Sequence, residues 1–290
     1  MDLYDVAQYF DDIKVYDAYS GAYLFTCQMD QYDATTRDSM TGWRRTCSAP
    51  VITIPPRRVI RIQGFDYICG QTFKDFFVDR VIREHLLMHP SDGLFTLGTA
   101  RQFIDEEEDM TSFHGALAVR KEVKEEGESS QFFAVYNIYL ALTETAERDL
   151  LVRGPDNIFY RIQSIEVQTG RYRTLFVSEL GMDALTTVVY TPAGDYDVTT
   201  DTTAAGTPQT LAAVVERYQT NYRYMTWAAE KFRNGDIVVT VSEEDLAAPK
   251  NNDRVLARGR DYRVLEAQQD GFGCWELQCR PTNFNLVVET

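Results

Sequence analysis

Three short stretches of this chain share one pattern, in which a turn ends at a tyrosine and apolar and polar residues then alternate. Tyr67, Tyr160 and Tyr262 mark these stretches, and they recur roughly every 100 residues. Alternation after a turn is typical of a strand that enters a β-hairpin. The sequence therefore predicts about three copies of one small β unit rather than a single enzyme-sized core.

Composition points to the same fold class. Apolar residues make up 44% of the chain, which is enough for packed cores, and aromatic residues make up 12%, with 17 Tyr and 16 Phe against 3 Trp. Aromatic and β-branched side chains fit the pleated, half-buried surface of a sheet. We therefore expect a mainly β protein made of tandem small β-barrel or β-sandwich units, with long loops and one or two short helices.

Shifts in charge along the chain suggest where these units begin and end. Residues 105–109 and 121–128 are rich in charged side chains and offer little apolar surface for packing. We expect a first β unit at 1–104, an acidic loop or linker at 105–130, a middle β segment at 131–206 and a C-terminal β unit at 207–290. Tyr160 lacks a preceding glycine, so the middle segment is expected to diverge from the two terminal units.

Local signals predict individual elements within these units. Glycine and asparagine turns between alternating segments predict hairpins within 58–69, 159–178 and 262–279. Residues 76–88 fit both a helix and a strand, and we favour a strand. Thr207 and Pro208 suit the start of a helix, so a helix is predicted over 211–218.

Net charge and cysteine usage limit the expected binding partners and the expected cellular compartment. Lys and Arg total 29 against 44 Asp and Glu, and the net charge of −15 argues against affinity for phosphates and for anionic membranes. It does not oppose passage of DNA, which slides past acidic walls without binding. The five cysteines lack Cys-x-x-Cys spacing, and the chain starts without a basic and apolar leader, so we expect folding in a reducing cytosol.

A metal site is one reading of the histidines. His85 and His89 have the spacing that places two imidazoles on one helical face, and Glu84 and His114 could complete a ligand set. The general-base Glu of the His-Glu-x-x-His pattern is absent, and the helical spacing is lost if this segment is a strand. Surface or interface histidines are the favoured interpretation, and we expect no metal or cofactor.

The sequence gives even less support for a catalytic site than for a metal site. The carboxylate pairs Asp195/Asp197 and Glu243/Glu244 and the run at 105–109 are expected by chance among 44 acidic residues. The serine nucleophile elbow, the P-loop and the dinucleotide-binding glycine pattern are absent. The repeated tyrosines could stack on sugars or bases, but a ring at the start of a strand more often packs inside a small barrel. We therefore expect no catalytic residue and no enzyme.

The C-terminal unit carries a recognisable order of motifs. A Gly-Asp step at Gly235 and Asp236 leads into an apolar strand, an Asp-x-Val strand at 253–255 leads through Gly259 to Tyr-x-Val at 262–264, and a hairpin strand at 275–277 closes the unit. This order resembles head-closure and head-tail connector proteins of the tailed-bacteriophage neck. The resemblance covers about 60 residues and implies a small β-barrel with loop insertions.

The resemblance implies a structural, non-enzymatic virion component that forms a ring between portal and tail and gates or seals the DNA conduit. Its expected partners are copies of itself and portal, neck or tail proteins, with DNA passing through without specific binding and no membrane. It would be assembled in the host cytoplasm. The acidic loop at 105–128 and the segment at 199–208 are expected to serve as interface arms.

Two other functions stay open at this point. The first is another particle protein, in the tail tip, the baseplate or the capsid decoration. The second is a carbohydrate-active or carbohydrate-binding β protein that uses its aromatic rings and carboxylates. Two carboxylates in an aromatic cleft would favour this last alternative, whereas tyrosines buried in separate barrels would count against it.

Overall fold

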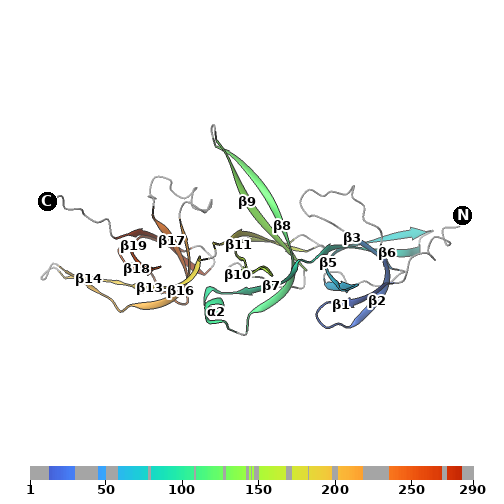
Figure 1. The fold of residues 1–290 in the computed structure, drawn as a ribbon, viewed down its shortest axis with the longest axis horizontal. Coiled ribbons are helices and arrows are strands. Elements are labelled where there is room, and N and C mark those ends of the chain that lie inside the picture. The colour runs from blue at the N-terminus through green and yellow to red at the C-terminus, as the bar shows by residue number, and fades with distance from the viewer. Residues whose placement is uncertain are drawn as a thin grey trace. The chain divides into compact units, whose positions relative to one another are not determined.

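The computed structural model shows a mainly β protein in the residues it describes (Figure 1). It describes residues 13–29, 45–49, 58–77, 80–107, 109–126, 129–141, 144, 146, 150–167, 172–181, 183–197, 202–217, 235–269 and 273–282. Within these residues there are three closed six-stranded barrels, one two-stranded sheet and one short helix. The prediction of a mainly β chain made of tandem small barrels is confirmed.

The first barrel encloses a compact apolar core. It is formed by β1 (Ile13–Asp17), β2 (Tyr23–Met29), β3 (Arg45–Ala49), β4 (Val59–Ile62), β5 (Phe65–Phe77) and β6 (Arg80–Pro90). Its strands pair antiparallel around a closed circuit, with β1 hydrogen-bonded to both β2 and β4. Of residues 76–88, which fitted both a helix and a strand, 76–77 end β5 and 80–88 lie in β6, a strand as favoured, while 78–79 lie outside the described residues. Val15, Phe25 and Ile60 are among the side chains buried inside.

The second barrel follows after two residues of connection. It is formed by β7 (Gly93–Gly98), β8 (Thr111–Glu126), β9 (Ser129–Leu140), β10 (Leu151–Arg153), β11 (Phe159–Val167) and β12 (Arg173–Glu179). The rings of Phe95 and Phe113 stack inside it, with centroids 5.7 Å apart. A Cβ atom on Gly115 would lie 2.6 Å from the Phe95 ring. Only glycine at this position avoids a steric clash with the ring.

The third barrel contains a small inserted hairpin. Its strands are β13 (Leu185–Thr191), β16 (Gln209–Arg217), β17 (Ile237–Ser242), β18 (Arg254–Ala257), β19 (Arg260–Gln269) and β20 (Cys274–Pro281). The hairpin consists of β14 (Ala193–Asp197) and β15 (Thr202–Ala205), and lies between the first and second strands of the barrel.

All three barrels have the same strand order. Counted along the chain within each barrel, the neighbours are the first, second, third, sixth, fifth and fourth strands, and the fourth closes onto the first. Closure satisfies the backbone of every strand and removes exposed sheet edges. The structure thus repeats one supersecondary unit three times, and the middle unit has the same topology as the other two.

The three tyrosines occupy equivalent places in this repeat. Tyr67, Tyr160 and Tyr262 each lie near the start of the fifth strand, on β5, β11 and β19, and all are at most 6% exposed. Two-residue turns precede the first and last of them, and both central residues of each turn have positive φ, as a type I′ hairpin requires. Tyr160 instead follows a longer loop, which explains its weaker sequence signal.

The described chain divides into two compact units. The first contains residues 1–97, 111–148 and 152–178, and the second contains 98–110, 149–151 and 179–290. The helix α2 (Ala100–Asp105) belongs to the second unit and packs on β13 and β16. Its capping box, formed by Thr99 and Gln102, starts the helix with satisfied backbone donors.

Two predictions are wrong at the level of local structure. Residues 111–126, predicted to be part of an acidic loop or linker, form β8 and pair with β9 as far as Glu126 and Ser129. The pairing begins inside the barrel and continues along the backbone, so it needs no apolar face at the charged end. In the same way, the segment at 199–208, expected as a loop, contains β15.

The helix predicted at 211–218 is also wrong, because 209–217 form β16. Val214 and Val215 are β-branched, and β16 lies between β13 and β17 with apolar residues buried. Tertiary pairing therefore overrides the helix propensity of Ala212 and Ala213. The unit boundaries move as well, because the second barrel begins at β7 and the third at β13 rather than at 131 and 207.

Candidate functional site

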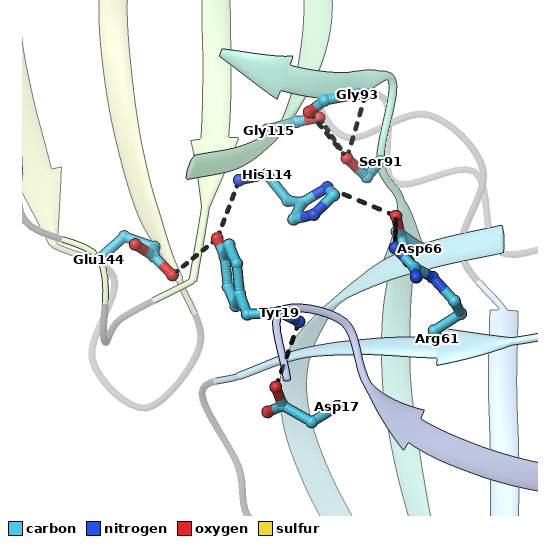
Figure 2. Close-up of polar contacts among 9 residues, drawn as sticks. All are labelled: Asp17, Tyr19, Arg61, Asp66, Ser91, Gly93, His114, Gly115 and Glu144. Atoms are coloured by element: carbon cyan, nitrogen blue, oxygen red, sulfur yellow. Dashed lines mark hydrogen bonds and ion pairs between the residues drawn. The ribbon is translucent and has the colours of Figure 1, made fainter. Parts of the chain in front are cut away.

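Several polar contacts of the first compact unit lie where its two barrels meet (Figure 2). The short connection between β6 and β7 is hydrogen-bonded to both barrels. Ser91 donates its backbone N–H to the carbonyl of Asp66 at 2.8 Å, and Asp92 donates its own to the carbonyl of Gly115 at 2.9 Å. The Asp92 carboxylate also accepts from the N–H of Leu117. The connection is therefore held by residues of both barrels.

Tyr19 links the barrels at a second point. It lies in the turn between β1 and β2, where the carboxylate of Asp17 accepts hydrogen bonds from the N–H groups of Tyr19 and Ser20. The Ser20 backbone donor is the main cause that lowers the pKa of Asp17. The Tyr19 hydroxyl accepts from the N–H of His114 at 3.0 Å and donates to Glu144 at 2.9 Å. Burial raises the pKa of this hydroxyl, which keeps it protonated as a donor.

His114 is a buried side chain at the centre of this junction. Its ring lies 5.1 Å from that of Tyr19, and its Nδ1 lies 3.6 Å from the Asp66 carboxylate, beyond hydrogen-bond length. Nδ1 has no hydrogen-bond partner among the described residues. Arg61 holds Asp66 through two bonds of 2.7 and 3.0 Å. Burial lowers the pKa of His114 although Asp66 opposes this, so the imidazole is neutral near pH 7.

Small apolar side chains complete the contact between the two barrels. Ala18, Val59 and Ile68 of the first barrel form one buried cluster with Ala141 of the second, and Ala116 packs against it. Short side chains allow backbones to approach closely, and burying them adds a favourable hydrophobic term. We name the set Tyr19, Asp66, His114 and Glu144 the Tyr19 junction.

His89 makes a further contact between the same barrels. It is 3% exposed, stacks on Tyr139 with ring centroids 5.8 Å apart and meets Tyr172 edge-on at 5.4 Å. His89 and His114 thus have different neighbours, and the structure does not describe the side chains of Glu84 and His85. Among the residues it describes, no three His, Cys, Asp or Glu side chains gather to hold a metal.

The chemistry of these groups is that of structural contacts. Ser91 donates its hydroxyl to the carbonyls of Gly93 and Gly115 and makes no bond to an imidazole. The thiols of Cys69 and Cys279 are fully buried, and burial raises the pKa of both, which disfavours the nucleophilic thiolate. The junction can position two barrels, and its described groups do not form a nucleophile-base pair.

The carboxylates considered in the sequence lie on three elements of the second compact unit. Glu243 and Glu244 are on the turn after β17, and Asp105 pairs with Arg101 on α2 at 3.6 Å. Asp195 and Asp197 lie on β14, and their side chains are outside the described part. Arg101 also reaches Asp245, on the turn that carries Glu243 and Glu244, at 3.5 Å, so α2 and this turn are neighbours joined by one arginine.

The motif residues of the third barrel prove to be internal anchors. Asp236, which is buried, binds Arg280 through two bonds of 3.0 and 2.9 Å and so joins the strands at the third and sixth positions. Asp253, also buried, accepts from the Tyr190 hydroxyl and from the N–H groups of Ala193 and Lys250. We name Tyr190, Ala193, Lys250 and Asp253 the Asp253 cluster. Both carboxylates serve the barrel itself.

Sequence reasoning missed the Tyr19 junction. Its members are far apart in the chain and follow no motif spacing, so only the fold brings them together. The one local signal is the Asp-x-x-Ser step at Asp17 and Ser20, which indicates a turn that presents Tyr19. The sequence contains no signal for its partner Glu144.

Comparisons with protein-family models, with curated proteins and with solved structures gave no match. Within the described residues, no helix has the length and apolar character needed to cross a membrane.

Proposed function

We propose that this chain is a structural protein of a tailed-bacteriophage particle, part of the head-tail connector that joins the portal to the tail and lets DNA pass. The observation that supports this most strongly is the repeat of three closed six-stranded barrels with one strand order. Closed barrels have no free sheet edges and therefore act as stable building blocks of an assembly. This agrees with the barrel implied by the motifs at 235–277.

The charge of the chain supports the same function. A net charge of −15 disfavours adhesion of DNA, as a conduit requires. The Tyr19 junction adds a physical reason for a scaffold, because hydrogen bonds and buried alanines hold the first barrel against the second. A component that joins the portal to the tail must keep its barrels in fixed positions.

The carbohydrate-binding alternative loses its main support. Tyr67, Tyr160 and Tyr262 are buried in three separate barrels and offer no shared face for stacking on a sugar. The other particle positions, in the tail tip, the baseplate or the capsid decoration, differ from the connector in location and copy number.

Location in the particle tests the proposed function directly. Antibodies against the folded chain, applied to purified particles with tails and to heads whose tails have been removed, are expected to label one vertex of each head. Label spread over the whole capsid would indicate a decoration protein, and label at the far end of the tail would indicate a tip or baseplate protein. Either of these results, or particles without any label, would overturn the connector function.

A further inference from the structure

Two of the three histidines of the chain are buried between the first and second barrels. His89, on β6 of the first barrel, packs against Tyr139 and Tyr172 of the second. His114, on β8 of the second barrel, packs against Tyr19 of the first. Histidine gains a charge between about pH 5 and pH 8, and histidines at an interface can make that interface sensitive to pH. The contact between these barrels therefore contains groups that respond to acid.

The two barrels are separate closed structures, so their contact can open without unfolding either of them. Each closes on its own apolar interior. Between them lie the small cluster around Ala18 and Ala141 and the hydrogen bonds of Tyr19. Contacts between domains of one chain permit relative motion unless they are large and hydrophobic. A change that weakens this contact is therefore expected to separate the barrels before it unfolds them.

His114 contributes to the contact through both its backbone and its ring. Its N–H donates to the Tyr19 hydroxyl at 3.0 Å, and its ring lies 5.1 Å from that of Tyr19 (Figure 2). The Tyr19 hydroxyl in turn donates to Glu144. Movement of the His114 ring therefore disturbs the hydrogen bonds that join the two barrels.

The surroundings of the His114 ring disfavour a proton on Nδ1. Among the described residues, the titratable and charged groups that face the ring are Asp66, Arg61, Glu144 and Tyr19. The Asp66 carboxylate lies 3.6 Å from Nδ1 and already accepts two hydrogen bonds from Arg61, whose positive charge opposes a second one nearby. Asp66 and Glu144 favour the proton, but burial outweighs them and lowers the pKa of His114.

We propose that the contact between the first and second barrels is an acid-sensitive joint, in which protonation of the buried His114 releases Tyr19 and lets the two barrels move apart. In the open form the imidazole is in water and holds a proton at its ordinary pKa. The open form then binds more protons than the closed one, so a fall in pH favours opening. The joint lies within one chain and is independent of the proposed place of the protein in a particle.

Amide hydrogen exchange of the full chain, followed by NMR between about pH 7 and about pH 5.5, tests this joint. Protection factors remove the intrinsic effect of pH on exchange, and the protection of the His114 amide should fall by about threefold or more on acidification. The amides of Cys69 and Gly154 bond inside the first and the second barrel. Their protection should not change, which distinguishes opening of the contact from unfolding of a barrel.

Two substitutions identify the group that responds to acid. His114→Gln keeps the backbone N–H and removes the titratable ring, so the loss of protection at residue 114 on acidification should disappear. His89→Gln removes the other buried imidazole and should leave that loss unchanged. If His89→Gln abolishes the pH dependence and His114→Gln does not, the role given to His114 is wrong.

Asp66→Asn tests the direction of the effect. Asp66 favours the protonated ring, so its replacement should make the His114 amide lose more protection on acidification. If the protonated ring instead binds Asp66 and tightens the contact, protection rises at low pH in the wild type and this gain is lost in Asp66→Asn. Protection that rises on acidification, or that follows the amides of Cys69 and Gly154 at every pH, would overturn the joint.

Discussion

The Asp253 cluster and the Tyr19 junction are both polar and partly buried, but they differ in completeness. Asp253 accepts three hydrogen bonds from groups of its own barrel. The Tyr19 junction joins residues of two barrels, and His114 Nδ1 has no hydrogen-bond partner in the part of the chain that the structure describes. A fully satisfied buried network specifies one structure, whereas a buried polar group without a partner reduces stability. The Asp253 cluster is therefore expected to contribute more to the stability of its barrel than the Tyr19 junction contributes to the contact between the first two barrels.

The largest effect is expected from Asp253→Ala. This change leaves the Tyr190 hydroxyl and the N–H groups of Ala193 and Lys250 without their acceptor, at a cost of about 3 kcal/mol. Hydrogen exchange should become faster in β13 and β18 and stay unchanged in the first unit. Asp183→Ala, which removes an exposed carboxylate paired with Arg258, is the control and should have little effect. Equal effects of the two variants would contradict the role given to the cluster.

A somewhat smaller effect is expected from Gly115→Ala. Gly115 lies in the second barrel and is adjacent to His114 of the Tyr19 junction, so the change affects both. The added Cβ would lie 2.6 Å from the buried Phe95 ring, and overpacking of this kind costs about 2 kcal/mol. Thermal unfolding should shift downward. Gly181→Ala serves as the control, because its Cβ would meet only Asp183 at 3.7 Å. An unshifted unfolding temperature for Gly115→Ala would show that the second barrel is less tightly packed than described.

Tyr19→Phe tests the junction alone. Loss of the hydroxyl removes the acceptor of the His114 N–H and the donor to Glu144, at a cost of about 1 kcal/mol. The amide of His114 should exchange faster, while the third barrel is unaffected. Tyr23→Phe removes an exposed hydroxyl that bonds to Thr26 and should leave this exchange unchanged. Faster exchange throughout the third barrel, or an unchanged rate at the His114 amide, would contradict the distinction between the two regions.

The smallest effect is a dependence on pH at the junction. Burial lowers the folded pKa of His114 below its ordinary value of 6.5, so the unfolded chain binds more protons as pH falls. The stability contributed by the neutral imidazole is therefore present above pH 6.5 and is lost as pH falls from there through the folded pKa. Denaturation between about pH 5 and 7 should show this slope, and His114→Gln should flatten it. A slope of opposite sign would mean that Asp66 outweighs burial.

Much of the fold follows from the sequence, because its signals are local. Glycine turns before Tyr67 and Tyr262 have the positive φ angles that two-residue hairpins need, and apolar alternation places the rings inside. These interactions act over a few residues. The hairpins and the β class were therefore predictable from the chain.

The errors arose where distant contacts decide the structure. Residues 209–217 are a strand only because β13 and β17 lie on either side of them, and β8 continues through a charged segment only because β9 pairs with it. The Tyr19 junction shows the same limit, since the bond from Tyr19 to Glu144 joins turns that are far apart in the chain. Closure of a barrel is a non-local event that no short pattern contains.

An electron cryo-microscopy map of the neck of the particle would test the central claim most directly. The account predicts copies of this chain in a ring around the DNA path, each with three six-stranded barrels of one strand order, and with Tyr19 bonded between the first two. A map in which this chain is absent from the neck, or in which its barrels differ in strand order, would contradict the account.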